Sequence, residues 1–288
     1  MKNSMRKSAA VLIVTALIAT LLSSCTETTQ YPLISDYEYC VVFLNIGYGD
    51  CTIIKAGGDY YMIDTASADH ARDVTSFLAA EGITELKGLF LTHTDSDHTG
   101  GLFYVSDVVK IDCIYYPYYS EPDDKGQNQL EMKAESLGVE HSALSGGDTV
   151  ETDNITFEIL GPTEYYEYDD NDNSLVIHAE IDGIVYLFAG DMQFYEENLV
   201  LASGADVSCD VLKVGNHGNR DATSSEFLSA ASPSVAVISA NRAEKSTSAS
   251  LRVTTLLSSV CDYYVTENSE YCIITYKNES GEIAVEID

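Results

Sequence analysis

The chain has 288 residues, with 46 Asp and Glu against 15 Lys and Arg, and its formal net charge at pH 7 is −31. This length is enough to bury one large core. So acidic a composition fits a soluble secreted protein, and it disfavours nucleic acid and anionic lipid as partners unless metal ions or a local basic patch offset the negative field.

The first 25 residues have the pattern of a bacterial lipoprotein signal peptide. Lys2, Arg6 and Lys7 precede an uncharged apolar run, 9–22, which is shorter than the ~20 residues of a membrane-spanning helix. Small residues then lead to Cys25. We expect lipoprotein signal peptidase to cleave the chain just before Cys25, and the Cys25 thiol to carry a lipid. An ordinary secretory signal with an incidental Cys25 is the alternative.

This pattern predicts three parts: a signal peptide over 1–25, a polar tether over 26–37 and one domain over 38–288. We expect the mature protein on the extracellular face of the cell membrane, held by its lipid anchor and without a transmembrane domain, because no second long apolar run follows.

Short β-branched and aromatic runs alternate with amphipathic helical stretches along the domain. The expected strands are 41–46, 52–56, 60–63, 88–91, 111–115, 155–160, 174–181, 184–188, 211–214 and 235–238, followed by a terminal meander from Cys261. The expected helices are 68–81, 100–105, 127–137, 193–202, 224–231 and 248–257. Two mixed halves of similar order predict an α/β (α+β) fold of four layers, with two mixed sheets face to face and helices outside.

Turns, loops and cysteines complete this reading. Gly47–Asp50 is predicted to be a hairpin turn, because it lacks the Lys and the helix of a phosphate loop. The acidic segment 164–172 and the tyrosines of 115–119 are expected in surface loops. The six cysteines after Cys25 have the pattern of small buried hydrophobes, and a Cys261–Cys272 disulfide is the one pairing considered.

The strongest chemical signal is the segment 92–101, Thr-His-Thr-Asp-Ser-Asp-His-Thr-Gly-Gly, which follows an apolar strand. His93 and Asp95 share one side of an extended chain because alternate residues point the same way. A turn into a helix then brings Asp97 and His98 to the other side of the same cavity. Two imidazoles and two carboxylates so close predict a bound cation rather than a solvated polar loop.

This segment resembles the His-x-His-x-Asp-His signature of the metallo-β-lactamase superfamily, with Asp95 in place of the second His. The Asp variant followed by Gly-Gly resembles the hydrolase domain of ComEC-type competence proteins. Further segments that resemble that domain are 42–51, 61–65, 173–176, 187–191 and 210–218. The resemblance implies the metal ligands His93, Asp95, Asp97, His98, Asp191 and His217, with catalytic roles for Asp97, Asp191 and His217.

The implied chemistry is metal-dependent hydrolysis. A bridging Asp191 would hold two divalent ions, Zn²⁺ or Mn²⁺, ~3.5–4 Å apart with a hydroxide between them as the nucleophile. The oxygen-rich ligands shift the preference toward harder ions such as Mn²⁺. We expect a cell-surface phosphodiesterase, acting on a small phosphodiester or a nucleic-acid-derived substrate. Amide or lactone hydrolysis and a non-catalytic metal-binding module are the alternatives.

The chain departs from the family pattern at two places. Asn216 stands where the family has the first of two adjacent His, and it is expected to orient a ligand or the substrate. A third family His has no clear counterpart, and Asn173 or Ser174 occupies its approximate position. Asp64 is expected to orient a metal-binding imidazole or to form a turn. Lys213 is expected to reach a substrate phosphate or to extend to solvent.

The other histidines are not expected to bind metal. His178 is predicted to pack in or on a sheet, because it lies within an apolar strand. His70 and His141 have polar neighbours and are predicted to be surface residues.

Overall fold

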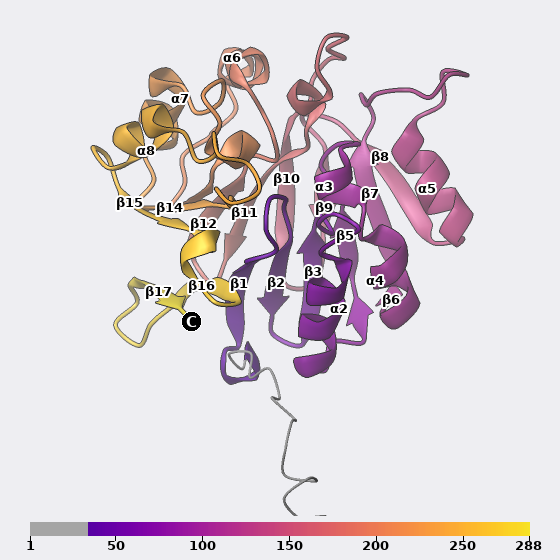
Figure 1. Cartoon of the computed structure of the whole chain (residues 1–288), viewed down its shortest axis with the longest axis horizontal. Helices are drawn as coiled ribbons and strands as arrows, with labels where there is room; N and C mark the ends of the chain where they lie inside the picture. Colours follow the sequence, from indigo (N-terminus) through magenta and orange to yellow (C-terminus); the bar gives the residue numbers. More distant parts are fainter. Residues whose placement is uncertain (1–33) are drawn as a thin grey trace, which may run out of the picture. The chain divides into compact units, whose positions relative to one another are not determined.

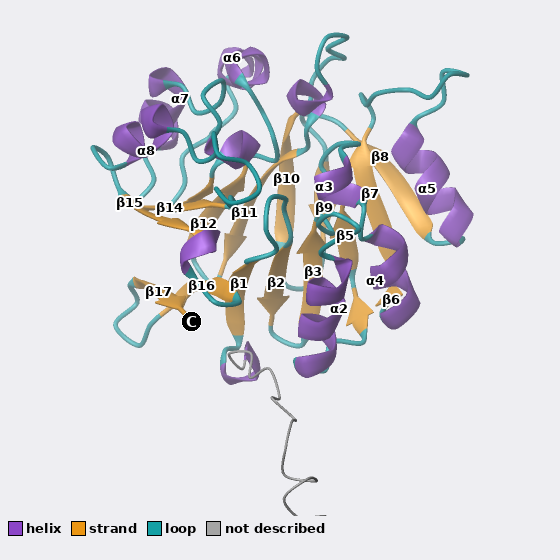
Figure 2. Cartoon of the chain, in the orientation of Figure 1, coloured by secondary structure: helices purple, strands orange, loops and turns teal. Residues whose placement is uncertain are grey.

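The computed structural model describes residues 34–288, which lie within one compact unit. Two large mixed sheets pack against each other, and helices cover the outer faces (Figure 1). Helices, strands and loops are distinguished in Figure 2. The predicted four-layer α/β fold is therefore confirmed. Cys25, the predicted signal peptide and most of the predicted tether lie outside the described residues.

The first sheet has, among residues 34–288, the strand order β17-β16-β1-β2-β3-β5-β7-β8. In chain order these strands are β1 (Tyr39–Leu44), β2 (Thr52–Ala56), β3 (Asp59–Ile63), β5 (Gly88–Phe90), β7 (Cys113–Pro117), β8 (Glu140–Leu144), β16 (Cys272–Lys277) and β17 (Ile283–Ile287). The part from β17 to β3 is antiparallel, and the part from β3 to β8 is parallel.

The second sheet of the described residues has the order β15-β14-β13-β12-β11-β10-β9. Its strands are β9 (Thr149–Glu151), β10 (Thr156–Gly161), β11 (Val176–Ile181), β12 (Ile184–Phe188), β13 (Val211–Lys213), β14 (Val235–Ile238) and β15 (Asp262–Val265). The pairs from β9 to β12 are antiparallel, and those from β12 to β15 are parallel. A short parallel pair, β4 (Glu85–Leu86) and β6 (Lys110–Ile111), lies apart.

Helices lie on the outer side of each sheet (Figure 1). Those beside the first sheet are α2 (Ala71–Ala80), α4 (Leu102–Val108) and α5 (Gln129–Leu137), and the one-turn α3 (Ser96–Thr99) lies at its edge. Those on the second sheet are α6 (Phe194–Ser203), α7 (Ser225–Ala231) and α8 (Leu251–Leu257). Four 3₁₀ turns of the described chain are η1 (Ile34–Asp36), η2 (Asp170–Asn173), η3 (Gly215–Gly218) and η4 (Thr266–Asn268). None of the described helices is long and apolar enough to cross a membrane.

Sequence signals explain where these helices begin and end. The Asn128 side chain accepts hydrogen bonds from the backbone N–H groups of Leu130 and Glu131, so it caps the start of α5. Gly138 ends α5 in the left-handed conformation, φ 66°, which glycine adopts without steric cost.

The main core lies between the two sheets, where alternate residues of each strand point inward. Phe90 of the first sheet and Phe157 of the second have ring centroids 4.7 Å apart, and Tyr61 meets Phe157 at 5.2 Å. Burying an aromatic side chain of this size contributes about 1.5–3 kcal/mol. This apolar layer fixes the two sheets against each other and thus the relative positions of the loops at their ends.

The structure corrects four sequence expectations. The segment from Cys261 is not a simple meander, because β15 joins the second sheet whereas β16 and β17 join the first. Tyr115 and Tyr116 lie in β7 rather than in a loop. Cys261 and Cys272 are both free. Ile34, assigned to the tether, is fully buried, so the folded part begins earlier than residue 38.

Candidate metal centre

The predicted metal ligands lie in loops that follow strands at one edge of the two sheets. His93 and His98 follow β5, Asp191 follows β12, and His217 lies in η3 directly after β13. Because β12 and β13 are parallel neighbours, their carboxyl ends bring Asp191 and His217 together. The inter-sheet core then holds the loop after β5 opposite them.

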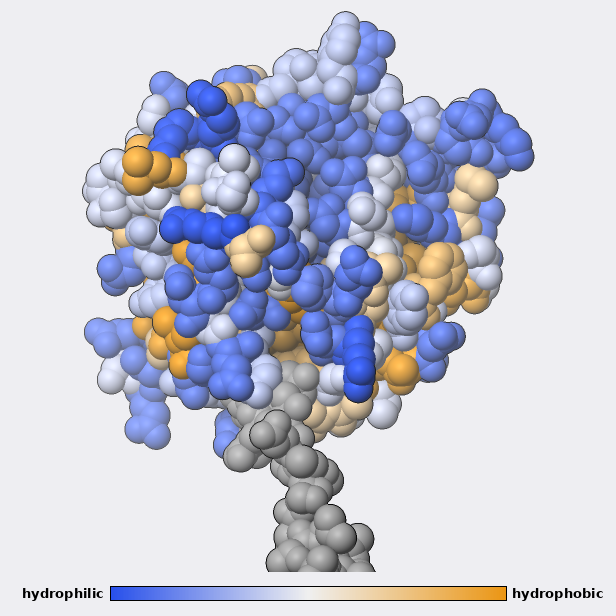
Figure 3. Space-filling view, viewed as in Figure 1, coloured by the Kyte–Doolittle hydropathy of each residue, from blue (hydrophilic) through white to orange (hydrophobic). Residues whose placement is uncertain are grey.

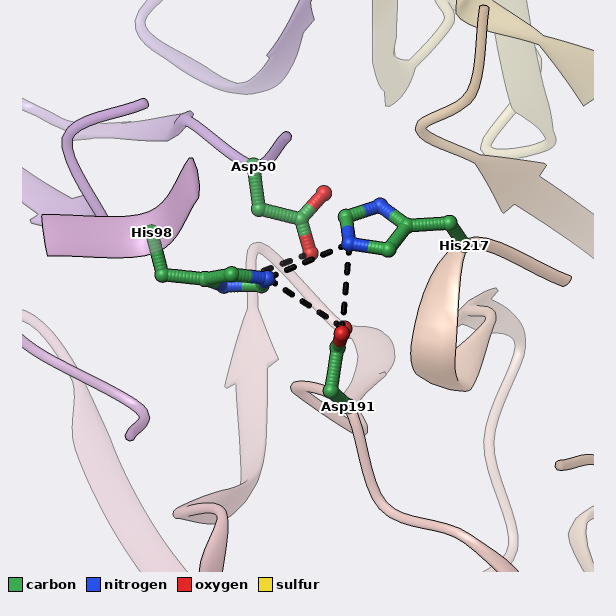
Figure 4. A group of neighbouring side chains, drawn as sticks. All are labelled: Asp50, His98, Asp191 and His217. Carbon is green, nitrogen blue, oxygen red and sulfur yellow. Dashed lines mark hydrogen bonds and ion pairs between the residues drawn. The ribbon is translucent and has the colours of Figure 1, made fainter. Parts of the chain in front are cut away.

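Four buried side chains converge at one point: Asp50, His98, Asp191 and His217 (Figure 4). One potential ligand atom from each lies within 4.8 Å of all the others. The Nε2 atoms of His98 and His217 are 3.2 Å apart. Asp191 approaches both rings, with Oδ1 3.4 Å from Nε2 of His98 and Oδ2 3.2 Å from Nε2 of His217.

Both imidazoles are oriented through their Nδ1 atoms. Nδ1 of His217 lies 3.0 Å from the carbonyl oxygen of Ser239, which accepts only, so this nitrogen donates. Nδ1 of His98 lies 2.7 Å from Oδ2 of Asp64 and donates to that carboxylate. In the neutral rings both Nε2 atoms therefore carry lone pairs, and two lone pairs 3.2 Å apart require a proton or a metal ion between them.

Asp64 is held rigidly in this position. Its Oδ1 accepts the backbone N–H of Thr92 at 2.8 Å, and its Oδ2 accepts the Thr92 hydroxyl at 2.7 Å. Asp64 also has φ 58° at the end of β3, so it forms a turn as well. Both roles proposed for Asp64 from the sequence thus have a counterpart in the geometry.

The buried carboxylates of the cluster favour a positive charge beside them. Burial disfavours ionisation of Asp191, but the two imidazoles outweigh it and hold the pKa of Asp191 well below its usual value. Burial likewise disfavours the His217 imidazolium, but Asp191 and Asp97 outweigh it and raise the pKa of His217 to about 9. The pKa of His98 is also raised, against burial, by Asp191 and Asp64. The carboxylates therefore stabilise a cation where the ring nitrogens converge.

Buried polar atoms without a hydrogen-bond partner among the described residues give a direct test of metal fit. They include Oδ1 of Asp50, Nε2 of His93 and Oδ1 of Asp191. Such atoms are costly to leave unsatisfied, typically by about 1–3 kcal/mol each. Imidazole nitrogens and carboxylate oxygens are ligands of divalent ions, so this set fits a metal ion.

The remaining motif residues lie around the cluster. Oδ2 of Asp97 is 3.4 Å from Nε2 of His217. His93 is fully buried, and its Nε2 lies 3.7 Å from Oδ2 of Asp95, whose side chain is 51% exposed. Ser174 Oγ accepts the backbone N–H of Asp191 at 3.0 Å and lies 3.5 Å from Nδ1 of His93. His93 and Asp95 thus form a second group next to the four-residue cluster.

Asp50 is the site residue that the sequence analysis missed. Gly47–Asp50 does lie in the turn between β1 and β2, but the Asp50 carboxylate points into the cluster (Figure 4). Its Oδ2 accepts a 2.6 Å bond from Nζ of Lys213, which is 3% exposed and so does not extend to solvent. A lone Lys within an apolar strand was the available signal, because a buried ammonium needs a carboxylate partner.

Two predicted residues lie beside the cluster without a bond to it. The Asn173 side-chain amide accepts a hydrogen bond from the backbone N–H of Tyr166 and donates one to the backbone carbonyl oxygen of Tyr166. The Asn216 amide bonds Asn219 at 2.8 Å and Asp221 at 3.4 Å. Both therefore shape the loops around the site.

The histidines that were not expected to bind metal lie away from the four-residue cluster. His178 is on β11 and meets the Ser208 carbonyl at 2.9 Å. His70 meets Asp73 and Glu244. His141 forms a separate, more exposed group with Glu131 and Glu135.

Comparison with known sequences identifies a family. The sequence profile described as the metallo-beta-lactamase superfamily matches residues 44–240. The chain is 30% identical over 232 residues to ComE operon protein 3 of Bacillus subtilis (74% of this chain, 29% of that protein) and 30% identical over 212 residues to the competence protein ComA of Neisseria gonorrhoeae (73% and 28%). The chain thus spans less than a third of the length of these relatives.

Solved structures share the fold at low sequence identity. The metallo-beta-lactamase fold protein YhfI of Bacillus subtilis has a TM-score of 0.52 at 10% identity, covering 87% of this chain and 100% of that protein. The E377D mutant of the CmlA beta-hydroxylase also has a TM-score of 0.52, at 13% identity, over 78% of this chain and 52% of that one.

Proposed function

The chain belongs to the metallo-beta-lactamase superfamily, and from this premise we propose that it is a metal-dependent hydrolase that cleaves phosphodiesters. The observation that carries the proposal is the convergence of two oriented imidazoles and two buried carboxylates on one point. Ring nitrogens turned toward each other in this way serve no structural purpose without a cation.

The candidate ligands would hold metal ions in two groups. One ion would be held by Asp97, His98, Asp191 and His217, and a second by His93 and Asp95. Divalent ions bound there would supply a water molecule of lowered pKa and neutralise charge on the reacting group.

The chain's own residues would order this site before a substrate arrives. Asp64 and the Ser239 carbonyl fix the two ring planes, so no reorganisation is needed when the metal binds. The Tyr48 ring packs 4.2 Å from the His217 ring and shields it from solvent on that side. Lys213 balances the Asp50 carboxylate, which would otherwise be a bare buried charge.

A phosphodiester is favoured as the substrate because the ligand set is oxygen-rich relative to an all-imidazole site, with the three carboxylates of Asp95, Asp97 and Asp191 beside three imidazoles. An oxygen-rich ligand set prefers hard ions such as Mn²⁺. Hard ions also bind the oxygens of phosphoryl groups well. Hydrolysis of an amide or a lactone does not call for a hard metal ion, and a metal-binding module would show no turnover. The test below distinguishes both alternatives from the phosphodiesterase.

The test is turnover by the full chain after metal removal and reloading with Mn²⁺ or Zn²⁺. A chromogenic phosphodiester, a lactone and a β-lactam are compared as substrates. We expect phosphodiester cleavage that is abolished by Asp191→Ala and His217→Ala, with loss of bound metal in Asp191→Ala. His178→Ala is the matched control, since it removes an imidazole outside the site. Preference for the lactone or the β-lactam, or tight metal binding without any turnover, would refute the proposal.

We also propose that the protein is tethered to the outer face of the membrane through Cys25, which lies outside the described residues. Cys25→Ser should leave precursor that is uncleaved or differently processed. A mature N-terminus elsewhere, with a free amine and no lipid, would refute this assignment.

A further inference from the structure

An open pocket of about 860 Å³ lies next to the metal centre, between the segment 219–221 and the segment 242–252. We call it the arginine pocket, and its charged lining residues are Arg220, Asp221, Arg242, Lys245 and Arg252. Figure 1 places α8, which carries Arg252, and the neighbouring α7 at the upper left. In Figure 3 some of the most hydrophilic residues on this face lie over the same region.

The charge of this pocket is opposite to that of the chain as a whole. About a quarter of the charged residues in the sequence are basic, 15 against 46. In the arginine pocket four of the five charged lining residues are basic. The arginine pocket therefore gathers basic side chains against the negative average of the chain, and such a cluster can attract an anion.

Most of this positive charge is not neutralised. Arg220, Lys245 and Arg252 have no carboxylate within ion-pair distance among residues 34–288. Arg242 is the exception, with its Nε 3.6 Å from Oε1 of Glu267. Three of the four cations thus remain available to a ligand.

The Arg252 guanidinium is held in place by neutral groups. It donates to the backbone carbonyl oxygens of Arg220 at 2.8 Å and Thr223 at 3.1 Å, and also to that of Ala222. Its Cζ lies 5.2 Å from the centroid of the Phe194 ring. These contacts fix the cation without cancelling its charge, which lowers the entropic cost of binding an anion.

The arginine pocket is continuous with the wall of the metal centre. Nζ of Lys245 lies 5.2 Å from the Tyr48 ring centroid, and that ring packs 4.2 Å from the His217 ring. Asn219, which lines the pocket, donates to the Tyr48 hydroxyl at 3.2 Å. The arginine pocket and the metal cluster therefore share the Tyr48 side chain as a common wall.

We propose that the arginine pocket binds the phosphates of the substrate chain that neighbour the scissile phosphodiester. The substrate is then a linear polymer of phosphodiesters rather than an isolated diester. This inference rests on the proposed function, and it names the substrate class of the same site. Both a single-stranded nucleic acid and a poly(glycerol phosphate) chain carry this repeating chemistry.

The test is equilibrium binding measured without hydrolysis. The full chain, purified in neutral detergent and kept in a metal chelator, is titrated into fluorescent oligomers of equal charge, one an oligodeoxythymidylate and one a poly(glycerol phosphate). Arg220→Gln/Lys245→Gln removes two cations that make no ion pair within the described part of the chain. Lys87→Gln/Lys110→Gln is the control, because it removes the same charge at the distant β4–β6 pair.

We expect three to four phosphate contacts, which on a single strand give a slope of log affinity against log salt of roughly −2 to −3. Wild-type affinity should then fall about 15- to 60-fold between 50 and 200 mM salt. The pocket variant should bind roughly 10- to 30-fold more weakly at low salt, with a slope reduced by about 1.4, and the control variant should keep the wild-type slope. The polymer that binds more tightly identifies the source of the chain.

Two outcomes separate this inference from the proposed function. Binding of neither polymer, or equal binding by the pocket variant and wild type, would overturn the role of the arginine pocket even if the enzyme cleaves a small diester. Pocket-dependent binding without cleavage after metal loading would support the anion site and refute the phosphodiesterase.

Discussion

The buried pair of Lys213 and Asp50 gives the sharpest stability prediction. The two charged atoms are 2.6 Å apart, and the side chains are 3% and 6% exposed. Replacing Lys213 by Met keeps the volume of the apolar strand but leaves the Asp50 carboxylate buried without its partner. Removing one member of a buried ion pair typically costs 3–5 kcal/mol, so we expect about that loss in the free energy of unfolding, or roughly 10 °C in Tm.

The pH dependence of this loss has a defined sign. Burial disfavours the Asp50 carboxylate, but Lys213 and the two imidazoles outweigh it and keep the pKa of Asp50 below its usual value. The pair therefore stabilises the wild type above the unfolded pKa of an Asp, and this stabilisation disappears as the pH falls through the folded pKa. The loss in Lys213→Met should be largest at neutral pH and should shrink as Asp50 becomes protonated.

The assay is urea unfolding at several pH values, in chelator and with Mn²⁺ or Zn²⁺. Bound metal should recover part of the loss, because it offers the Asp50 carboxylate a new cation. Lys55→Met is the matched control. Lys55 is also a buried strand lysine, but its Nζ donates to the Ile34 carbonyl at 2.9 Å rather than to a carboxylate. Its loss should therefore not depend on metal.

A double-mutant cycle with Asp50→Asn isolates the interaction. The double variant should lose clearly less than the sum of the two single variants, because the second change removes the uncompensated charge that the first one left. If Lys213→Met in chelator at pH 7 lies within about 1 kcal/mol of wild type, or if the two changes add, the pair does not hold the site together.

Three further predictions concern residues next to the centre. Asp64→Asn should weaken metal binding by about 10- to 100-fold, because the carboxylate that orients His98 is lost; metal titration measures this, and unchanged affinity would contradict it. Burial and the nearby Asp172 raise the pKa of Glu196 well above its usual value, so the stability of the wild type should fall as the pH rises above about 4.5. Urea unfolding of Glu196→Gln should show a smaller fall over the same pH range. Identical pH profiles of the two proteins would be evidence against this prediction. Asn216→His should retain or increase turnover and bound metal, since the family pattern has an imidazole there; loss of metal would argue that the amide is required.

The sequence by itself determined the local structure and the principal candidate ligands. Strand and helix periods are set by neighbouring residues, so β2 and β12 have the predicted bounds. The segment 92–101 encodes four candidate ligands within six positions, and its spacing suffices to indicate a cation. Asp191 and His217 needed the family resemblance, because each is a single polar residue after an apolar strand.

Contacts between residues that are distant in the sequence were decided by the tertiary structure alone. Asp50 and Lys213 are 163 positions apart, and their ion pair exists because the two sheets are packed face to face. The path of the chain after Cys261 was decided in the same way, since β15 and β16 have similar patterns but belong to different sheets.

The distribution of charge shows most clearly which properties the sequence determines and which depend on the tertiary structure. Composition gave a net charge of −31, from which we expected long polyanions to be repelled. Folding gathers Arg220, Arg242, Lys245 and Arg252, spread over 33 positions with acidic residues between them, around one pocket beside the metal centre. Because electrostatic attraction is strongest at short range and is screened over about 10 Å, a ligand in that pocket responds to these four cations rather than to the average of the whole chain.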